Sequence, residues 1–346
     1  MLGGGVFITQ NKILPGTYIN FVNASAASST LGARGVVAIA LPLVDATAGK
    51  VVECCASDFY KQREDVLGVG VPESSVKVLD EIFKHANKVY IFNSVDDASI
   101  ETICNAFEPY EFNVLAAYTD EETDVNSYIA QVKAWRDEMG KKCQVVVYNA
   151  TKPDYEGVIN VVSTVSDEGA DAHALVAWVA GAEAACPVNS SCTNMIYDGA
   201  YTVVVDKTQA ELQDCIDAGQ IAFHLVYGEI RLLEDISSLT TVTEQKGEDF
   251  KYNQTIRVVD QIANDIAKLF NTKYLGKIPN NASGRVSLWA DIVAHHRNLE
   301  TLQAIENFNS ALLTVEPGNN KKSVVINDVI TVTNAMSQLY MTVVIQ

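Results

Sequence analysis

The sequence predicts an α/β fold with a central mixed or parallel sheet and flanking helices, a smaller α+β C-terminal domain, and extended N- and C-terminal β arms. Apolar runs of strand length alternate with segments of helical periodicity between residues 36 and 236, a pattern typical of a sheet covered by helices. Two long amphipathic segments then follow each other with no strand between them. Strand-like apolar segments also lie near both ends of the sequence, at 18–21 and 340–346.

The first 35 residues are rich in Gly, Ser and Ala, which indicates an arm and a linker around one short strand. A Pro-Gly pair precedes this strand and predicts a turn. The next predicted elements are a strand at 36–44 that Pro42 ends, and helices at 57–65 and 73–87, the second capped by Ser74 or Ser75.

Strands and helices then alternate in the middle of the chain. The predicted strands are 88–93, 112–119, 143–150, 158–166 and 200–206. The predicted helices are 99–110, 124–142 (capped by Asp124 or Asn126 and stopped by Gly140), 171–186 and 208–219. Since the segment 171–186 is apolar on nearly every face, we expect this helix to be buried on most sides.

A hairpin and a mainly helical segment complete the pattern. The predicted elements are a β-hairpin at 221–236 that turns at Gly228 and Glu229, a polar loop at 240–253, helices at 254–277 and 286–308, a strand before a Pro-Gly-Asn-Asn turn at 317–320, an alternating strand at 325–330, a turn at 334–339 and a final strand at 340–346. The predicted divisions are an N-terminal arm (1–22), an α/β region (23–245), a C-terminal α+β domain (246–325) and a C-terminal arm strand (326–346).

The composition is that of a packed globular protein. The chain has 346 residues, of which 48% are hydrophobic and 20% charged. No apolar run approaches the roughly 18 residues of a membrane helix, and no secretory signal pattern is present, so we expect synthesis and folding in the cytoplasm. The seven cysteines form no C-x-x-C pair and are expected to be buried free thiols.

The charge is distributed unevenly. Residues 1–250 contain 16 Lys/Arg and 36 Asp/Glu, whereas residues 251–346 contain 9 and 7. With a formal net charge of −18, nucleic acid and anionic membranes are poor partners. The C-terminal part is either merely less acidic, or it faces something acidic or is buried in an assembly.

No strong catalytic, cofactor or metal motif is present. There is no P-loop and no nucleophile elbow, and the segment LGVGVPE (67–73) lacks the third glycine of a dinucleotide loop. The five histidines show no zinc-ligand spacing. The acidic run at 120–124 fits a helix N-terminus better than a cation site. We therefore predict no catalytic residue, cofactor or metal, although a site formed by distant residues is left open.

The apolar segments at the two ends raise a question of pairing. An exposed strand invites pairing with another chain, and LYMTVVIQ (339–346) carries no charge to prevent it. Each terminal strand either docks on the sheet of its own domain or adds a strand to a neighbouring subunit. The second arrangement is heterologous and builds an open helical array.

Three segments carry a resemblance to a known family. They are GGGVFITQNKILPGTYINF (3–21), the helical stretch from Arg257 to Arg285 that contains YLGK and NNASGR, and NAMSQLYMTVVIQ (334–346). Together these segments resemble contractile tail sheath proteins of phages and prophage-like particles of Gram-positive bacteria, including R-type bacteriocin-like particles. Asn334 stands where an acidic residue is common in that family. The resemblance covers the arm, the C-terminal third and the order of elements between them.

The resemblance implies a structural role and no enzymatic activity. Sheath subunits form hexameric rings stacked as a helix around an inner tube, their terminal arms are interwoven, and contraction drives the tube through the target envelope. The implied partners are further copies of this chain, the inner tail tube protein, and baseplate and tail terminator proteins, without nucleic acid or direct membrane insertion. The implied product is a phage tail, or a headless tail-like particle, that is released by lysis.

The resemblance also implies which residues make contacts. The expected intersubunit arm contacts are Pro15, Gly16, Tyr18, Ile19, Phe21, Met336, Tyr340, Met341, Val343 and Ile345. The possible tube-facing helix carries Arg285, His295, His296 and Arg297, for which a solvated helix face is the alternative. The alternatives for the whole protein are a different self-assembling structural protein and a soluble α/β enzyme with an unrecognised site.

Overall fold

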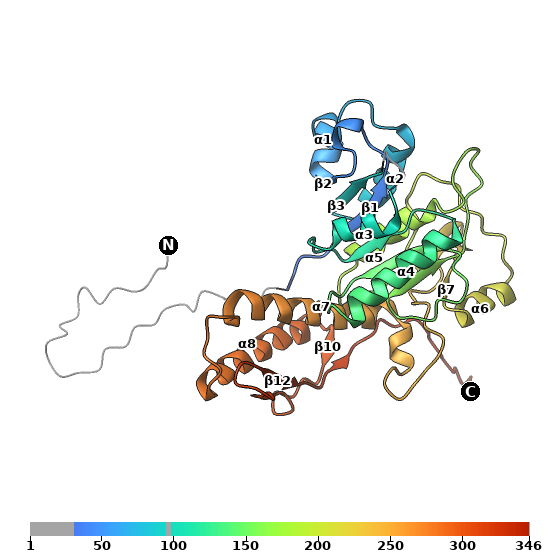
Figure 1. The fold of residues 1–346 in the computed structure, drawn as a ribbon. Helices are drawn as coiled ribbons and strands as arrows, with labels where there is room; N and C mark the ends of the chain where they lie inside the picture. Colours follow the sequence, from blue (N-terminus) through green and yellow to red (C-terminus); the bar gives the residue numbers. More distant parts are fainter. Residues whose placement is uncertain (1–30, 95–97, 346) are drawn as a thin grey trace, which may run out of the picture.

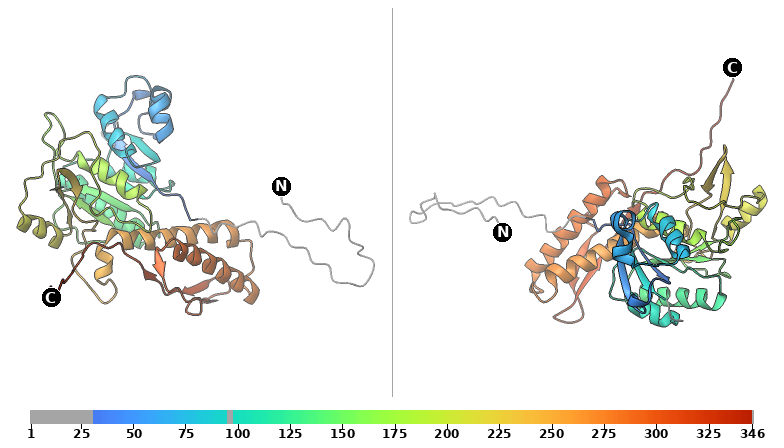
Figure 2. Two further views of the ribbon diagram at one scale, coloured as in Figure 1. Left: turned by 180° about the vertical axis from the view of Figure 1, so that it is seen from behind. Right: turned by 90° about the horizontal axis from the view of Figure 1, so that it is seen from above.

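The structure, a computed structural model, describes residues 31–94 and 98–345. Two lobes adjoin along one helix (Figure 1). We call residues 31–252 the α/β lobe and residues 253–335 the helical lobe. Residues 336–345, called the arm below, leave the body as an extended segment (Figure 2).

A seven-stranded sheet forms the centre of the α/β lobe. Its strands are β1 (Val36–Leu41), β2 (Val51–Cys55), β3 (Lys88–Asn93), β4 (Val114–Ala116), β5 (Gln144–Tyr148), β6 (Val158–Val161) and β7 (Gln220–Ile221). The order is β2-β3-β1-β4-β5-β6-β7, and every neighbouring pair is parallel except the antiparallel pair of β2 with β3. This mixed sheet with flanking helices confirms the predicted fold class.

Helices cover both faces of the sheet. They are α1 (Ala56–Leu67), α2 (Glu73–Phe83), α3 (Ile100–Phe107), α4 (Glu122–Asp137), α5 (Leu175–Ala185) and α6 (Gln209–Asp217). Val37 and Ile39 of β1 share a core with α2 and α5, whereas Ala38 between them faces the core of α3 and α4. Because both faces are covered, the central strands are apolar throughout rather than alternating.

Helix α5 is buried along its whole length except at its last residue, as its uniformly apolar sequence predicts. Gly181 lies where α5 crosses α2. A Cβ atom at this position would lie 2.4 Å from the carbonyl oxygen of Ile82. Only glycine therefore permits the two helices to approach so closely.

A short hairpin of β8 (Phe223–Val226) and β9 (Glu229–Leu232) extends from the α/β lobe. Its turn is formed by Tyr227 and Gly228, rather than by Gly228 and Glu229 as predicted. Both turn residues have positive φ, 50° and 87°, as the favoured two-residue hairpin turn requires.

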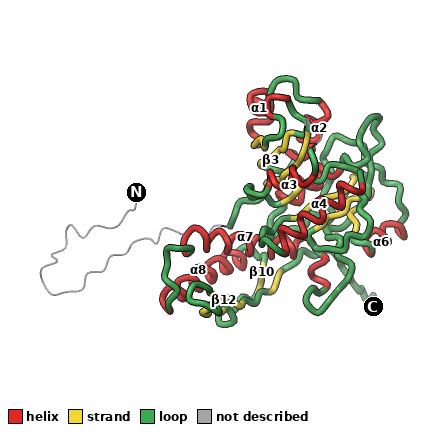
Figure 3. Tube along the Cα trace, in the orientation of Figure 1, coloured by secondary structure: helices red, strands yellow, loops and turns green. Residues whose placement is uncertain are grey.

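The helical lobe pairs two long helices with two small strand pairs (Figure 3). Its elements are α7 (Asn253–Leu269), a π-helical turn (Phe270–Tyr274), α8 (Ala282–Thr301), β10 (Ile305–Glu306), β11 (Thr314–Pro317), β12 (Val324–Asn327) and β13 (Thr331–Val332). Two short 3₁₀ turns, Asp45–Thr47 and Glu248–Lys251, occur in the α/β lobe. Strand β11 pairs with β12, and β10 with β13. None of the helices in the described residues has the length and hydropathy that a membrane span requires.

Several local predictions were wrong. Strand β2 was not predicted, and the segment 200–206 makes only an isolated bridge from Val203 to Val165. Helix α2 has Pro72 at its N-cap, because Ser75 instead donates a hydrogen bond to the carbonyl of Pro42. Helix α4 begins at Glu122, before both predicted caps.

Two further predictions can be compared with the structure: the state of the cysteines and the start of the C-terminal arm. All seven cysteines are free, and all but Cys55 are buried, as expected. The predicted C-terminal arm began at residue 326, but β12 and β13 pair within the helical lobe. In the described structure, the projecting segment begins only at Met336.

Candidate functional site

The arm is the most exposed apolar segment of the described chain. Its side chains with exposures of 69% or more are Met336, Leu339, Tyr340, Met341, Val343, Val344 and Ile345. The sequence carries no charged residue after Asp328. Residues 336–345 have no strand partner among residues 31–94 and 98–345. Their backbone groups and apolar side chains are therefore available to a partner outside it.

The segment just before the arm is held firmly. We call residues 331–335 the arm root. The side-chain amide of Gln254, on α7, donates to the carbonyl of Thr333 over 3.2 Å and accepts from the N–H of Ala335 over 2.8 Å. The hydroxyl of Thr255 lies 3.2 Å from the side-chain oxygen of Asn334. The first turn of α7 thus sets the direction in which the arm leaves the body.

The other end of the described chain also contacts α7. The N–H of Gly32 donates to Oδ1 of Asp265 over 3.0 Å, and Gln261 donates to the carbonyl of Gly32 over 3.3 Å. Two residues further on, the guanidinium of Arg34 donates to the backbone carbonyls of Glu183 and Cys186. This linker and the arm root are therefore fixed to the same helix.

One buried ion pair joins α7 to the α/β lobe. Arg136 of α4 binds Asp260 of α7 through two hydrogen bonds of 2.5 and 2.9 Å. The same guanidinium donates to the carbonyl of Cys143 over 2.8 Å. Both charged side chains are less than 10% exposed. A buried, bidentate pair of this kind holds two elements in one orientation.

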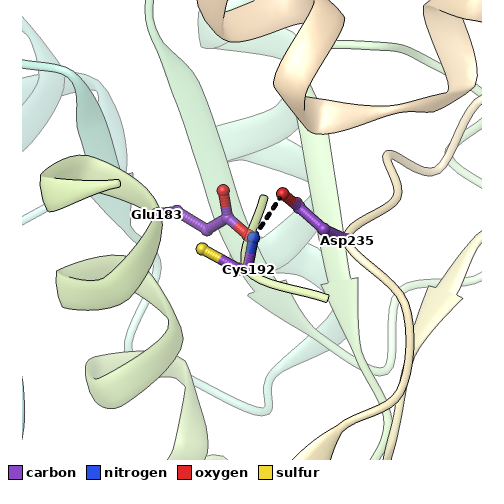
Figure 4. A group of neighbouring side chains, drawn as sticks. All are labelled: Glu183, Cys192 and Asp235. Atoms are coloured by element: carbon purple, nitrogen blue, oxygen red, sulfur yellow. Dashed lines mark hydrogen bonds between the residues drawn. The ribbon is translucent and has the colours of Figure 1, made fainter. Parts of the chain in front are cut away.

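A second buried cluster surrounds Arg257 of α7. Its guanidinium donates to Glu183 over 2.6 Å, to Asp235 over 3.1 Å and to the carbonyl of Ser190 over 2.9 Å. Figure 4 shows the two carboxylates on either side of Cys192, whose N–H donates to Asp235 over 2.9 Å. The side chains of Arg257, Glu183 and Asp235 are fully buried.

The two carboxylates of this cluster titrate differently. Burial and the charge of Asp235 raise the pKa of Glu183 well above its usual range, against the opposing effect of Arg257. Burial also acts to raise the pKa of Asp235, but Arg257 and hydrogen bonds to the carboxylate lower it overall. The geometry therefore favours a proton on Glu183 and a charge on Asp235.

The same cluster has the donor types of a metal site. Ligand atoms of Glu183, Cys192 and Asp235 lie within 4.8 Å of one another. However, the guanidinium of Arg257 already supplies a cation to both carboxylates, and a metal ion would have to displace it. The arrangement fits a structural ion-pair cluster that fastens α7 to the α/β lobe.

Comparisons with known proteins identify the family. Residues 93–238 match the model of the phage tail sheath protein central domain, and residues 245–346 match that of the phage tail sheath C-terminal domain. The chain belongs to the phage tail sheath protein family. This confirms the resemblance seen in the sequence.

Individual sheath proteins agree with this assignment. The tail sheath protein of Clostridium phage phiCD119 is 31% identical over 197 residues, which cover 56% of this chain and 54% of that protein. The chain spans about half the length of that relative. The crystal structure of a sheath tail protein from Listeria innocua has a TM-score of 0.78 at 22% identity, covering 89% of this chain and 94% of the other. The contracted helical sheath of the anti-feeding prophage has a TM-score of 0.69 at 16% identity, covering 96% and 99%.

The predicted contact residues of this sheath-family chain fall into separate groups. Met336, Tyr340, Met341, Val343 and Ile345 all lie on the exposed arm. The predicted contacts of the N-terminal arm lie outside the described residues: Pro15, Gly16, Tyr18, Ile19 and Phe21. The structure therefore places half of the predicted arm contacts, and all of those it places are exposed.

The prediction that α8 faces the tube through its histidines was wrong. His295 is 3% exposed and His296 is fully buried. Both follow the buried stripe of α8 formed by Leu288, Ile292 and Leu299, because residues three and four positions after Ile292 lie on the same side of the helix. The histidines could not have been placed without knowing which side of α8 is covered.

The two arginines of the same helix differ in exposure and in their hydrogen-bond partners. Arg297 is exposed and pairs with Glu300. Arg285 is half-buried, and its guanidinium donates to the side chain and the carbonyl of Asn280. These two arginines remain available as surface cations, separated by three turns of α8.

A large groove in the α/β lobe was not predicted. Its volume is about 980 Å³, and it lies between α1, α2 and the segments that carry Asp171 and Tyr201. Eight carboxylate residues and three basic residues line it, without a histidine or cysteine. The phenol of Tyr118 donates to Asp171 over 3.0 Å, and that of Tyr60 donates to Asp80 over 3.2 Å. The groove is acidic and lacks a nucleophile paired with a base.

Proposed function

We propose that this chain is a structural subunit of a contractile injection tail sheath. Subunits polymerise as stacked hexameric rings around an inner tube through interwoven terminal β arms, and the sheath contracts to drive the tube through the target cell envelope. Its partners are further copies of itself, the inner tail tube protein, and baseplate and tail terminator proteins. The particle assembles in the bacterial cytoplasm and is released by lysis as a phage tail or tail-like particle.

The exposed arm is the observation that carries this proposal. Ten uncharged residues project from the body and have no strand partner in the described part of the chain, so they are suited to adding a strand to another subunit. Because the arm of one copy reaches a different surface of the next, the contact is heterologous and propagates as an open helix. The strand that the arm pairs with is proposed to be the N-terminal segment from Pro15 to Phe21 of another subunit.

Helix α7 supports a role in contraction. The linker at Gly32 and the arm root at Thr333 are both bonded to α7, and Arg257 and Asp260 fasten the same helix to the α/β lobe. When the α/β lobe rotates, α7 rotates with it and redirects both chain segments. The arms then act as hinges whose strand pairing persists while the subunits turn.

The helical lobe is proposed to face the tube. The part of the chain from residue 251 onward carries a small positive net charge, unlike the acidic remainder. Arg285 and Arg297 remain as proposed tube contacts, without the two histidines. This orientation requires a tube surface that accepts a weakly basic partner.

Electron microscopy of the chain expressed alone tests the proposed function. We expect negative-stain images at high concentration to show striated hollow tubes, because the arms alone suffice to link subunits. The chain would be assigned another function if it stayed monodisperse even when a matching tube and baseplate were expressed with it.

A further inference from the structure

His296 occupies an unusual position between the core and the arm root. Its ring is fully buried on α8. Nε2 lies 2.7 Å from Oδ2 of Asp328, and Nδ1 lies 2.9 Å from the backbone carbonyl of Ile292. Asp328 is the first residue of the three-residue connection between β12 and β13, which leads into the arm root. The ring thus links the middle of α8 to the chain that leads into the arm.

The hydrogen-bond partners of His296 define its protonation. A backbone carbonyl only accepts, so Nδ1 must carry a hydrogen. A carboxylate also only accepts, so Nε2 must carry one as well. A neutral imidazole has a single N–H and cannot satisfy both partners. The pair therefore holds one proton more than a neutral ring beside a carboxylate.

We propose that His296 and Asp328 form a proton-dependent latch that holds the arm root against the helical lobe. While the proton is present, a charge-assisted hydrogen bond pins residue 328 to α8. When the proton is lost, a ring lone pair faces the carboxylate and the contact becomes repulsive. The connection at 328–330 is then released, and β13 and the arm root lose one of their anchors.

Few other charges face this pair. On α8 itself, the ring of His295 lies 5.4 Å from that of His296. The ring of Phe308 lies 5.0 Å from that of His296, and Arg297 lies over the same phenyl ring at 5.4 Å. Glu300 accepts from the backbone N–H of Phe308, and Asp265 of α7 is engaged by His295. Asp328 is therefore the one carboxylate in direct contact with the ring, among the described residues.

The neighbouring histidine provides an internal comparison. His295 bonds Asp265 over 2.9 Å through Nε2, and Asp265 also accepts from the N–H of Gly32. The two adjacent histidines therefore serve opposite ends of the described chain, His295 the linker and His296 the arm root. A substitution of one histidine should change the hydrogen-exchange protection only at the chain segment that this histidine contacts.

Hydrogen exchange of the unassembled full chain, isolated by size exclusion, measures the latch. We expect the amides of Thr333 and Ala335 to lose protection by roughly tenfold to a hundredfold, corrected for intrinsic exchange, as the pH is raised from about 6 to about 10. Both amides have defined acceptors, the carbonyl of Ala304 and the side chain of Gln254. Unchanged protection over this range would overturn the proposal.

Asp328→Asn distinguishes a proton latch from general alkaline loosening. In this variant a neutral ring donates from Nδ1 to Ile292 and accepts at Nε2 from the new amide, so no extra proton is needed. We expect the arm root to remain protected at high pH. His295→Gln is the matched control, with its effect confined to Gly32 and the alkaline loss at Thr333 retained. Equal alkaline loss in Asp328→Asn and in the unaltered chain would refute the latch.

A ring spectrum of the unaltered chain tests the same point independently of Asp328→Asn. Nitrogen and carbon NMR of labelled histidine should show hydrogens on both ring nitrogens of His296 while the arm root is protected from exchange, assigned by the signal missing in His296→Gln. A ring with a single N–H beside a protected arm root would contradict the proposal. The consequence for assembly rests on the proposed function of the arm, whereas these measurements need only the single chain. A failure of the latch and a failure of the sheath function are therefore distinguishable.

Discussion

At the scale of single residues, the most informative group is Arg257 with its two carboxylates. The three side chains are fully buried, so each charge has lost its contact with water. The pKa of Glu183 is raised well above its usual range by burial and by Asp235, while that of Asp235 is lowered by Arg257 and its hydrogen bonds despite burial. These opposite shifts favour the negative charge on Asp235 over that on Glu183.

The two carboxylates should therefore differ in a substitution test. Asp235→Asn removes the carboxylate that is favoured to carry the charge beside Arg257. Glu183 then ionises more readily, because the charge of Asp235 no longer raises its pKa, so we expect the free energy of unfolding to fall by about 3 kcal/mol, less than for a buried charge left unpaired. Glu183→Gln keeps Asp235 as the charged partner of Arg257 and should cost roughly 1 kcal/mol or less. Urea unfolding at neutral pH measures both. Equal losses would show that the charge is shared.

The pH dependence of this contribution has a definite sign. Folding lowers the pKa of Asp235, so its stabilisation is fully present above the ordinary aspartate range and is lost as the pH falls through the folded value. Folding raises the pKa of Glu183, so raising the pH from the ordinary glutamate range through the folded value reduces stability. Acid unfolding of Asp235→Asn should lack the first of these effects.

For single residues, the sequence predicted which side chains are exposed better than it predicted which side chains contact each other. The resemblance to sheath proteins implied that Tyr340 and its neighbours make contacts outside the chain, and in the structure these residues are exposed. The burial of His295 and His296 depends on which side of α8 is covered. Arg257 lies 74 residues from Glu183 along the chain, and no local pattern reports a pairing over that distance.

At the scale of elements, the arm combines a fixed root with a free end. Gln254 and Thr255 hold residues 333–335, whereas the following residues extend from the body. A root that fixes direction reduces the number of orientations that the free strand samples before it pairs. The entropy lost on assembly is reduced accordingly.

A charge in the middle of the arm should block assembly without affecting the fold. Met341→Lys places an ammonium group in a segment that we propose to be buried between subunits, and it should raise the concentration needed for polymerisation by about tenfold or more. Sedimentation of polymer and thermal unfolding of the monomer measure the two effects. Val69→Lys is the matched control, since Val69 is 78% exposed and Met341 77%. Similar inhibition by both variants would argue against a specific role of the arm.

The elements that the sequence predicted correctly are those with strong periodicity. Strand β3 has its predicted bounds, and the buried helix α5 lies within the predicted 171–186 but begins four residues later, at Leu175. The predicted strand at 200–206 was wrong, since its apolar run contributes only one bridge to Val165. Strand β2 was missed because its short VVECC segment directly precedes a helix.

At the scale of the whole molecule, helix α7 joins the two lobes through polar contacts. Besides its two arginine pairs, Asn253 accepts from Gln144 over 3.0 Å, and Asn264 donates to the carbonyl of Lys142 over 2.8 Å. Buried hydrogen bonds are directional, so this junction specifies one relative orientation of the lobes. A lobe movement that breaks it must expose or reorganise buried charges.

Breaking one junction pair should weaken the coupling between the lobes. Arg136→Met leaves Asp260 buried without a cation, and we expect a loss of about 3–5 kcal/mol and a calorimetric transition that separates into two. Arg297→Met removes a solvent-exposed partner of Glu300 and should cost about 1 kcal/mol or less. A single transition of unchanged midpoint in Arg136→Met would show that the lobes are coupled by other contacts.

For the whole molecule, the family and the fold class could be predicted, but the junction could not. The motifs near both ends and in the segment around YLGK are local and visible in the sequence. The pairing of Arg136 with Asp260 spans 124 positions, and the groove beside Tyr118 is formed by α1, α2 and the distant segments that carry Asp171 and Tyr201. Such features depend on tertiary structure and carry no local signal.

The composition of the arm has a practical consequence for limited proteolysis. The last lysine or arginine is Lys322, so trypsin has no cleavage site within the arm. Chymotrypsin, in contrast, can cleave after the exposed Tyr340 and Leu339, where extended backbone enters a protease readily. Brief digestion of free subunits should shorten them from this end, whereas subunits whose arms are paired in a polymer should keep their full mass. Mass spectrometry of the digest thus gives a simple count of engaged arms.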